Sequence, residues 1–135
     1  MSVSHIPTEL RRLVTERAGA RCEYCRLPEY IAFYPNECDH IVAEKHDGLT
    51  VPENLARTCA LCNRFKGSDL GSFDPQTGLF TFLFNPRTQV WSEHFASSQD
   101  VIIGLTPIGR VTVKLLQMNT PARIAERKQV REVGH

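Results

Sequence analysis

The sequence lacks the features of a membrane protein and those of a secreted one. No apolar run approaches the roughly 20 residues that a membrane-spanning helix requires. The N-terminal stretch, MSVSHIPTEL, lacks the apolar core of a secretory signal. We therefore expect a cytoplasmic protein with no membrane partner. Thiols stay reduced in that compartment, so disulfide bonds are not expected.

An excess of charge of either sign is also missing. The 135 residues carry a formal net charge of +1, and 23% of them are charged, as in an ordinary globular protein. This balance argues against a tail that holds nucleic acid by charge alone, so a polyanion would have to meet a local basic surface. Repeats, low-complexity tracts and obvious linkers do not occur. The length suits one domain, residues 1–135, with a core at about 20–70 and an extension at about 71–135.

Helix and strand signals both occur along the chain, which predicts an α+β fold. In the first half we expect a helix at residues 7–18 that Gly19 closes, a hairpin or bent strand at 30–42, and a helix from 53 to about 65. In the second half we expect strands at 79–84, 89–95 and 101–105, then helices at about 106–118 and 121–132.

The aromatic residues of the second half alternate with polar ones. This pattern predicts an apolar cluster beneath the C-terminal strands, made by Phe80, Phe82, Phe84, Trp91 and Phe95. Aromatic side chains also stack on nucleic-acid bases, which is the alternative interpretation.

Four of the five cysteines stand in two C-x-x-C pairs, Cys22 with Cys25 and Cys59 with Cys62. A C-x-x-C turn places two sulfurs about one tetrahedral edge apart, and two such turns complete the coordination of a structural Zn²⁺ ion. Closed coordination leaves no position for water or substrate, so this zinc is not expected to be catalytic. A redox-active pair is the alternative, which two pairs in one small chain disfavour. Cys38 is expected to be an ordinary buried thiol.

The polar residues between and beside these pairs resemble a known family. The segments CEYC, DHI, PENLA and CNRFKG, in this order, contain Asp39, His40, Asn54 and Asn63 and resemble the HNH nucleases, which have a ββα-metal (His-Me finger) core. RAGARCEYC, KGSDLGSFDPQTGLF and NPRTQVWSEHF look like one branch of stand-alone bacterial HNH proteins. The resemblance covers nearly the whole chain, less specifically after Phe95.

This resemblance implies roles for the four residues. A divalent cation such as Mg²⁺ would be held by Asp39 and Asn63, while Asn54 would brace the loop that holds His40. The chemistry is consistent with these roles, because a neutral imidazole such as that of His40 can activate water. Successive residues of a strand point to opposite sides, so Asp39 can bind a cation while His40 faces water. Many family members have His where this chain has Asn63, and an amide oxygen favours a hard ion.

Basic residues near these positions are candidate contacts to phosphate. They are Lys45, His46, Arg57, Arg64 and Lys66. Ion pairs with the chain's own acidic residues are the alternative, and His46 can also be a plain polar loop residue.

The sequence therefore predicts a metal-dependent endonuclease that hydrolyses phosphodiester bonds of DNA, as a monomer or a weak homodimer. A zinc module that binds nucleic acid without cutting it is one alternative, and it would be indifferent to loss of His40. A nuclease specific for RNA or for a particular structure is a second, and a zinc module that binds another protein is a third.

Overall fold

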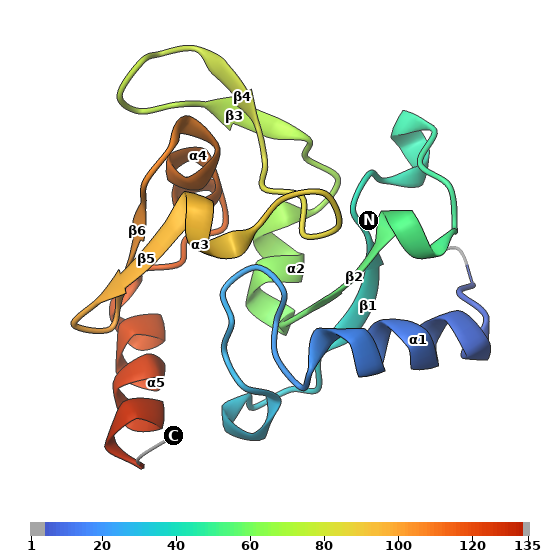
Figure 1. The fold of residues 1–135 in the computed structure, drawn as a ribbon, viewed down its shortest axis with the longest axis horizontal. Coiled ribbons are helices and arrows are strands. Elements are labelled where there is room, and N and C mark those ends of the chain that lie inside the picture. The colour runs from blue at the N-terminus through green and yellow to red at the C-terminus, as the bar shows by residue number, and fades with distance from the viewer. Residues whose placement is uncertain (1–4, 134–135) are drawn as a thin grey trace. The chain divides into compact units, whose positions relative to one another are not determined.

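The chain divides into two compact units, and the computed structural model describes residues 5–133 of it (Figure 1). The first unit is Met1–Asp69 and the second is Leu70–His135. The expected core at about 20–70 and extension at about 71–135 stay predictions. A single domain over 1–135 stays a prediction, and each unit is described by itself below.

The first unit begins with the expected helix, α1, Thr8–Ala18. Gly19 ends this helix in the left-handed conformation, with φ of 65°, which glycine adopts without steric cost. The buried side of α1 carries Val14, which packs with Ile6 and Leu55 in a small apolar core. Arg17 donates hydrogen bonds to two backbone oxygens, of Pro52 (3.0 Å) and Leu55 (2.8 Å), so it fastens the helix to the rest of the unit.

Two short strands and a helix follow in the order strand, strand, helix. β1, Glu37–His40, pairs antiparallel with β2, Leu55–Thr58, and α2, Ala60–Lys66, begins two residues later. Three short 3₁₀ turns lie in the connections, at Glu29–Ile31, Glu44–His46 and Pro52–Asn54.

Two expectations for this unit were wrong. The helix expected from residue 53 begins only at Ala60, because Leu55–Thr58 pairs with β1 and buries Leu55, Ala56 and Thr58. Pairing and burial override the moderate helix propensity of this stretch. Of the hairpin or bent strand expected at residues 30–42, only β1 is a strand. Residues 30–36 pair with no other strand of the described chain.

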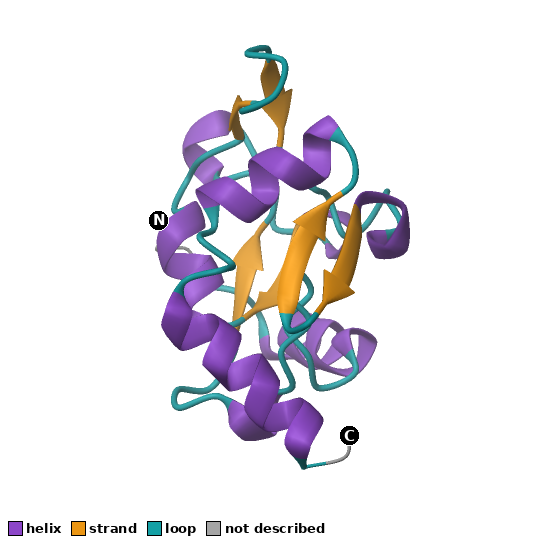
Figure 2. Ribbon diagram, turned by 90° about the vertical axis from the view of Figure 1, so that its left-hand side faces the viewer, coloured by secondary structure: helices purple, strands orange, loops and turns teal. Residues whose placement is uncertain are grey.

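In its described residues, the second unit consists of two antiparallel strand pairs and three helices. Figure 2 draws the strands of the chain in orange and its helices in purple. β3, Gly71–Phe73, pairs with β4, Phe80–Phe82, and β5, Phe95–Ser98, pairs with β6, Val101–Gly104. The helices are α3, Trp91–His94; α4, Pro107–Leu115; and α5, Pro121–Glu132. α4 packs against β6 and against the β3–β4 pair.

The expected helices α4 and α5 are confirmed, and the expected strand at residues 89–95 is wrong. Thr106 and Thr120 cap the two helices by accepting hydrogen bonds from the backbone N–H of Gly109 and Arg123. Trp91–His94 forms one helical turn, and the strand begins only at Phe95.

The expected aromatic cluster is only partly present. Phe84 and Phe95 are buried, with ring centroids 5.3 Å apart, and Trp91 stacks on Phe95 at 5.0 Å. Phe80 and Phe82, by contrast, are 55% and 65% exposed. They share the outer face of β4, because residues two apart in a strand point the same way.

One ion pair ties the β3–β4 pair to α4. The Arg110 guanidinium donates two hydrogen bonds to the Asp74 carboxylate, at 2.9 and 2.8 Å, and the Asp74 side chain is fully buried. The backbone N–H groups of Gln76 and Thr77 also donate to this carboxylate. Arg110 holds the pKa of Asp74 well below its usual value.

No helix in the described part of the chain combines the length and the apolar character that a bilayer span needs.

Candidate functional site

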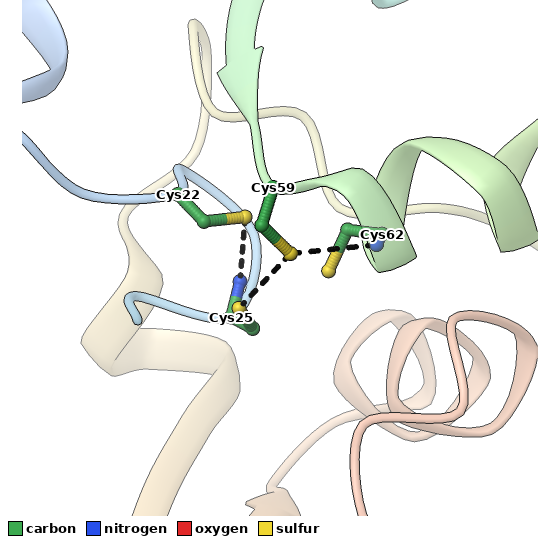
Figure 3. A group of neighbouring side chains, drawn as sticks. All are labelled: Cys22, Cys25, Cys59 and Cys62. Atoms are coloured by element: carbon green, nitrogen blue, oxygen red, sulfur yellow. Dashed lines mark hydrogen bonds between the residues drawn. The ribbon is translucent and has the colours of Figure 1, made fainter. Parts of the chain in front are cut away.

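The four paired cysteines come together in the first unit, as Figure 3 shows. Their sulfur atoms all lie within 4.8 Å of one another, and all four side chains are buried. Cys22 and Cys25 come from the loop after α1, whereas Cys59 and Cys62 come from the junction of β2 and α2.

Each C-x-x-C pair forms the expected tight turn around a sulfur. The backbone N–H of Cys25 points at Cys22 Sγ (3.5 Å), and that of Cys62 points at Cys59 Sγ (3.4 Å). The second contact also makes Cys59 the N-cap of α2. The same residue therefore belongs to the cysteine cluster and starts the helix that contains Asn63.

The cluster can hold a zinc ion. Four sulfurs about 2.3 Å from zinc form a tetrahedron with edges of about 3.8 Å, and Cys25 Sγ lies 3.8 Å from Cys59 Sγ. Burial raises the pKa of Cys22 well above its usual value, so in the absence of a cation this thiol keeps its proton. Zinc binding then releases protons and weakens as the pH falls.

Asp39 and His40 lie next to each other at the end of β1 and are both buried, at 8% and 2% exposure. Asp39 Oδ2 has no hydrogen-bond partner among the described residues. Burial raises the pKa of Asp39, and the nearby Lys66 ammonium lowers it again. A buried carboxylate oxygen without a partner suits a cation ligand.

One nitrogen of the His40 ring has a partner and the other does not. Nε2 lies 2.8 Å from the hydroxyl oxygen of Thr50, whereas Nδ1 has no hydrogen-bond partner in the described chain. Sequence reasoning missed Thr50. It stands in a loop ten residues from His40, and no pattern in the sequence points to it.

Asn54 ties together the two ends of the loop between β1 and β2. Its side-chain oxygen accepts a hydrogen bond from Val42 N (2.9 Å), and its nitrogen donates to the backbone oxygens of Val42 (3.0 Å) and Leu49 (2.8 Å). The loop passes so close to Val42 at Gly48 that a Cβ atom there would collide with the Val42 carbonyl. This loop carries Thr50, so Asn54 holds the segment whose hydroxyl contacts His40.

Two side chains of α2 reach β1. Asn63 is 5% exposed, and its Nδ2 donates to Glu37 Oε2 at 2.8 Å. Lys66 is 2% exposed, and its Nζ donates to the backbone oxygen of His40 at 3.2 Å. Burial lowers the pKa of Lys66, and the Asp39 carboxylate raises it. Glu37 was also missed, although it stands two residues before Asp39 and so on the same side of the strand.

The five candidate phosphate contacts differ in their surroundings. Lys45 and Arg64 are exposed, and His46 is exposed with Nε2 3.1 Å from the backbone oxygen of Ser68. Arg57 forms an ion pair with Glu29 at 2.7 Å, and Lys66 is buried as described above. Lys45 and Arg64 are therefore the two charged side chains of this set that are open to solvent.

Comparison with known proteins agrees with this geometry. Residues 22–69 match the family model of the HNH endonuclease. The matched segment contains the four cysteines together with Asp39, His40, Asn54 and Asn63, so the resemblance described above is confirmed for this part of the chain. Members of this family are generally nucleases, which act on nucleic acid. Neither the curated proteins nor the solved structures gave a match.

Proposed function

We propose that this protein is a metal-dependent endonuclease that hydrolyses phosphodiester bonds of DNA, with a ββα-metal core formed by β1, β2 and α2. The observation that carries this proposal is the meeting of β1 and α2. Lys66 of α2 donates to the His40 backbone oxygen and lies near Asp39, and Asn63 of α2 donates to Glu37 of β1.

His40 is the general base in this proposal. A neutral imidazole donates through one nitrogen and accepts through the other. If Nε2 donates its proton to the Thr50 oxygen, Nδ1 keeps its lone pair and can take a proton from water. Nδ1 is the nitrogen that has no hydrogen-bond partner among residues 5–133.

Asp39 and Asn63 are the protein ligands of a divalent cation such as Mg²⁺. Both offer oxygen atoms, which hard cations prefer. When bound, the cation stabilises the negative charge that develops on the phosphate during hydrolysis. Lys66 neutralises part of the charge of Asp39 and holds the His40 backbone through its carbonyl.

The zinc ion of the cysteine cluster is structural. With four thiolates around it, no position remains for water or for a phosphate oxygen. Its role is to fix the loop of Cys22 and Cys25 to the start of α2, which contains Asn63. Exposed Lys45 and Arg64 are the first candidates for contacts to the DNA backbone.

Cleavage of supercoiled plasmid tests this function. The zinc-loaded protein is incubated with Mg²⁺ or Mn²⁺, with and without chelator, beside His40→Ala. His5→Ala is the matched control, because it removes an exposed imidazole from the same unit. We expect metal-dependent nicking by the native protein and by His5→Ala. His40→Ala should lose at least about 100-fold in rate, the lower end of what general-base catalysis contributes.

Two outcomes would contradict the proposal. Equal rates for the native protein and His40→Ala would remove His40 from the chemistry. Binding of plasmid by the folded, zinc-loaded protein without cleavage in either metal would favour a non-catalytic nucleic-acid module. Parallel reactions with single-stranded DNA and with RNA identify the preferred nucleic acid.

A further inference from the structure

Glu37 is an acidic residue at the cation site to which the proposed function gives no role. It begins β1 and stands opposite Thr58 of β2. Residues two apart in a strand share a side, so Glu37 and Asp39 project toward the same side of β1.

The contact between Glu37 and Asn63 determines which end of the Asn63 side-chain amide faces Glu37. Glu37 Oε2 accepts a hydrogen bond from Asn63 Nδ2 at 2.8 Å. An ionised carboxylate can only accept, so it selects the NH₂ end of the amide and not the oxygen. A bond from a neutral donor to an ionised acceptor is also stronger than one between neutral groups. The amide is thereby held with its nitrogen toward Glu37 and its oxygen turned away from it.

This orientation matters because the two ends of an amide differ as ligands. The oxygen binds hard cations, whereas the NH₂ group does not. Asn63 is 5% exposed, so the surrounding protein also restricts its side chain. Without the carboxylate, the contact that selects the nitrogen end of the amide is lost, and part of the population could present NH₂ to the cation.

We propose that Glu37 is a positioning residue of the divalent-cation site, and that its carboxylate holds the Asn63 amide with the oxygen available as a ligand. This inference rests on the proposed function, since it assumes that Asp39 and Asn63 bind a cation. It adds Glu37, the first residue of β1, to the proposed cation site of Asp39 and Asn63.

Binding of Mn²⁺ to the zinc-loaded full chain tests this role without reference to cleavage. The signal of free Mn²⁺ in electron paramagnetic resonance gives the dissociation constant. The variants are Glu37→Ala, Glu37→Gln and Glu16→Ala, the last being a matched control that removes one exposed acid from α1. We expect Glu16→Ala to bind as the native protein does. Glu37→Ala should weaken binding by about 10- to 100-fold, the usual effect of a residue that orients a metal ligand.

Glu37→Gln separates the hydrogen bond from the charge. Its shape is nearly unchanged, so the fold should tolerate it. Its side-chain oxygen can still accept from Asn63 Nδ2, but its NH₂ group can also donate to Asn63 Oδ1, so part of the selection between the two ends of the amide is lost. We expect a smaller loss than in Glu37→Ala. Native affinity in Glu37→Gln would mean that no acceptor-only group is needed to select the end of the amide, and would overturn the proposal.

A double substitution tests whether Glu37 acts through Asn63. If it does, Glu37→Ala has little further effect once Asn63→Ala is present. Losses that add fully would instead make Glu37 a direct ligand and overturn the positioning role. If Glu37→Ala binds Mn²⁺ with native affinity while Asp39→Ala does not bind it, the role of Glu37 is refuted and the proposed function is not. Absence of Mn²⁺ binding by the native protein would refute both it and the proposed function.

Discussion

At the scale of single residues, the side chains proposed to do chemistry contact others that orient them. His40 can be identified from the sequence because DHI is a recognisable triplet. Thr50 cannot, since its contact with His40 exists only when the loop between β1 and β2 has closed. Asn54 closes that loop through three hydrogen bonds to backbone atoms.

The contact between His40 and Thr50 gives a prediction for catalysis. Thr50→Val keeps the shape of the side chain and removes the hydroxyl, so the imidazole loses its partner at Nε2. We expect the nicking rate to fall by about tenfold or more, within the roughly 100-fold cost of a misplaced catalytic group. Thr50→Ser should retain most of the rate. Zinc content and thermal unfolding of both variants should equal those of the native protein, and an unchanged rate in Thr50→Val would contradict the role.

Lys66 shows why sequence reasoning at this scale is incomplete. A lysine in CNRFKG beside a proposed nuclease site suggests a phosphate contact. In the structure its ammonium group is buried, donates to the His40 carbonyl and lies near Asp39. A lysine is rarely buried without a partner, and the partner here comes from a strand 26 residues earlier in the chain. Local sequence carries no information about such a contact.

At the scale of elements, the start of α2 depends on the cysteine cluster. Cys59 caps the helix, Cys62 lies in its first turn, and Asn63 follows directly. Zinc at the cluster would therefore fix the helix that holds the proposed cation ligand. Binding of zinc to small finger peptides contributes about 10 to 16 kcal/mol at neutral pH, which is comparable to the whole stability of a small domain.

Substitution of Cys59 tests this dependence. We expect Cys59→Ser to lose bound zinc and to unfold or aggregate at temperatures where the native protein is folded. Cys38→Ser is the matched control, because Cys38 is a half-buried thiol outside the cluster. Metal content by atomic emission and thermal unfolding by circular dichroism give the comparison. A Cys59→Ser protein with full zinc content and native unfolding would show that the cluster does not hold the metal.

The Asp74–Arg110 pair gives a prediction for the second unit. The folded-state pKa of Asp74 lies below its ordinary value of about 4. A depressed folded-state pKa contributes stability that is present above about pH 4 and is lost as the pH falls through the folded-state value. Asp74→Asn should therefore lower the unfolding temperature at pH 7, and this difference should shrink below about pH 4. Fluorescence of Trp91, the one tryptophan of the chain, reports on this unit; a difference that is constant with pH would contradict the assignment.

At the scale of the whole molecule, the two units are stabilised by different means. The first contains the cysteine cluster and a small apolar core around Val14 and Leu55. The second has no such cluster among its described residues and relies on packing of α4 against the two strand pairs, on capped helices and on buried Phe84 and Phe95.

Chelation of zinc should therefore affect the two units differently. We expect hydrogen exchange to become fast in residues 8–66 when a strong chelator is added, while amides of β5, β6 and α4 stay protected. Trp91 fluorescence should change little over the same titration. Loss of protection in both units together would show that they unfold as one cooperative body.

Much of the fold can be predicted from the sequence, and the failures share one physical cause. The pairs Thr106-Pro107 and Thr120-Pro121 predict the starts of α4 and α5, because helix capping depends only on residues close in the sequence. Leu55–Thr58 and Trp91–His94 were assigned to the wrong kind of element, because strand pairing and burial depend on distant residues. The exposure of Phe80 and Phe82 could not be predicted either, since alternation shows that a strand has two faces but not which one is covered.

The adjacency of Cys62 and Asn63 has a consequence for how this chain can change in length. Each residue added to a helix turns the following side chains by about 100° around its axis. One residue inserted between these two positions would swing the amide away from β1 while leaving all four sulfurs in place. Variants of this protein that gain or lose residues should therefore do so outside α2, and the exposed stretch from Phe33 to Pro35 should tolerate such changes.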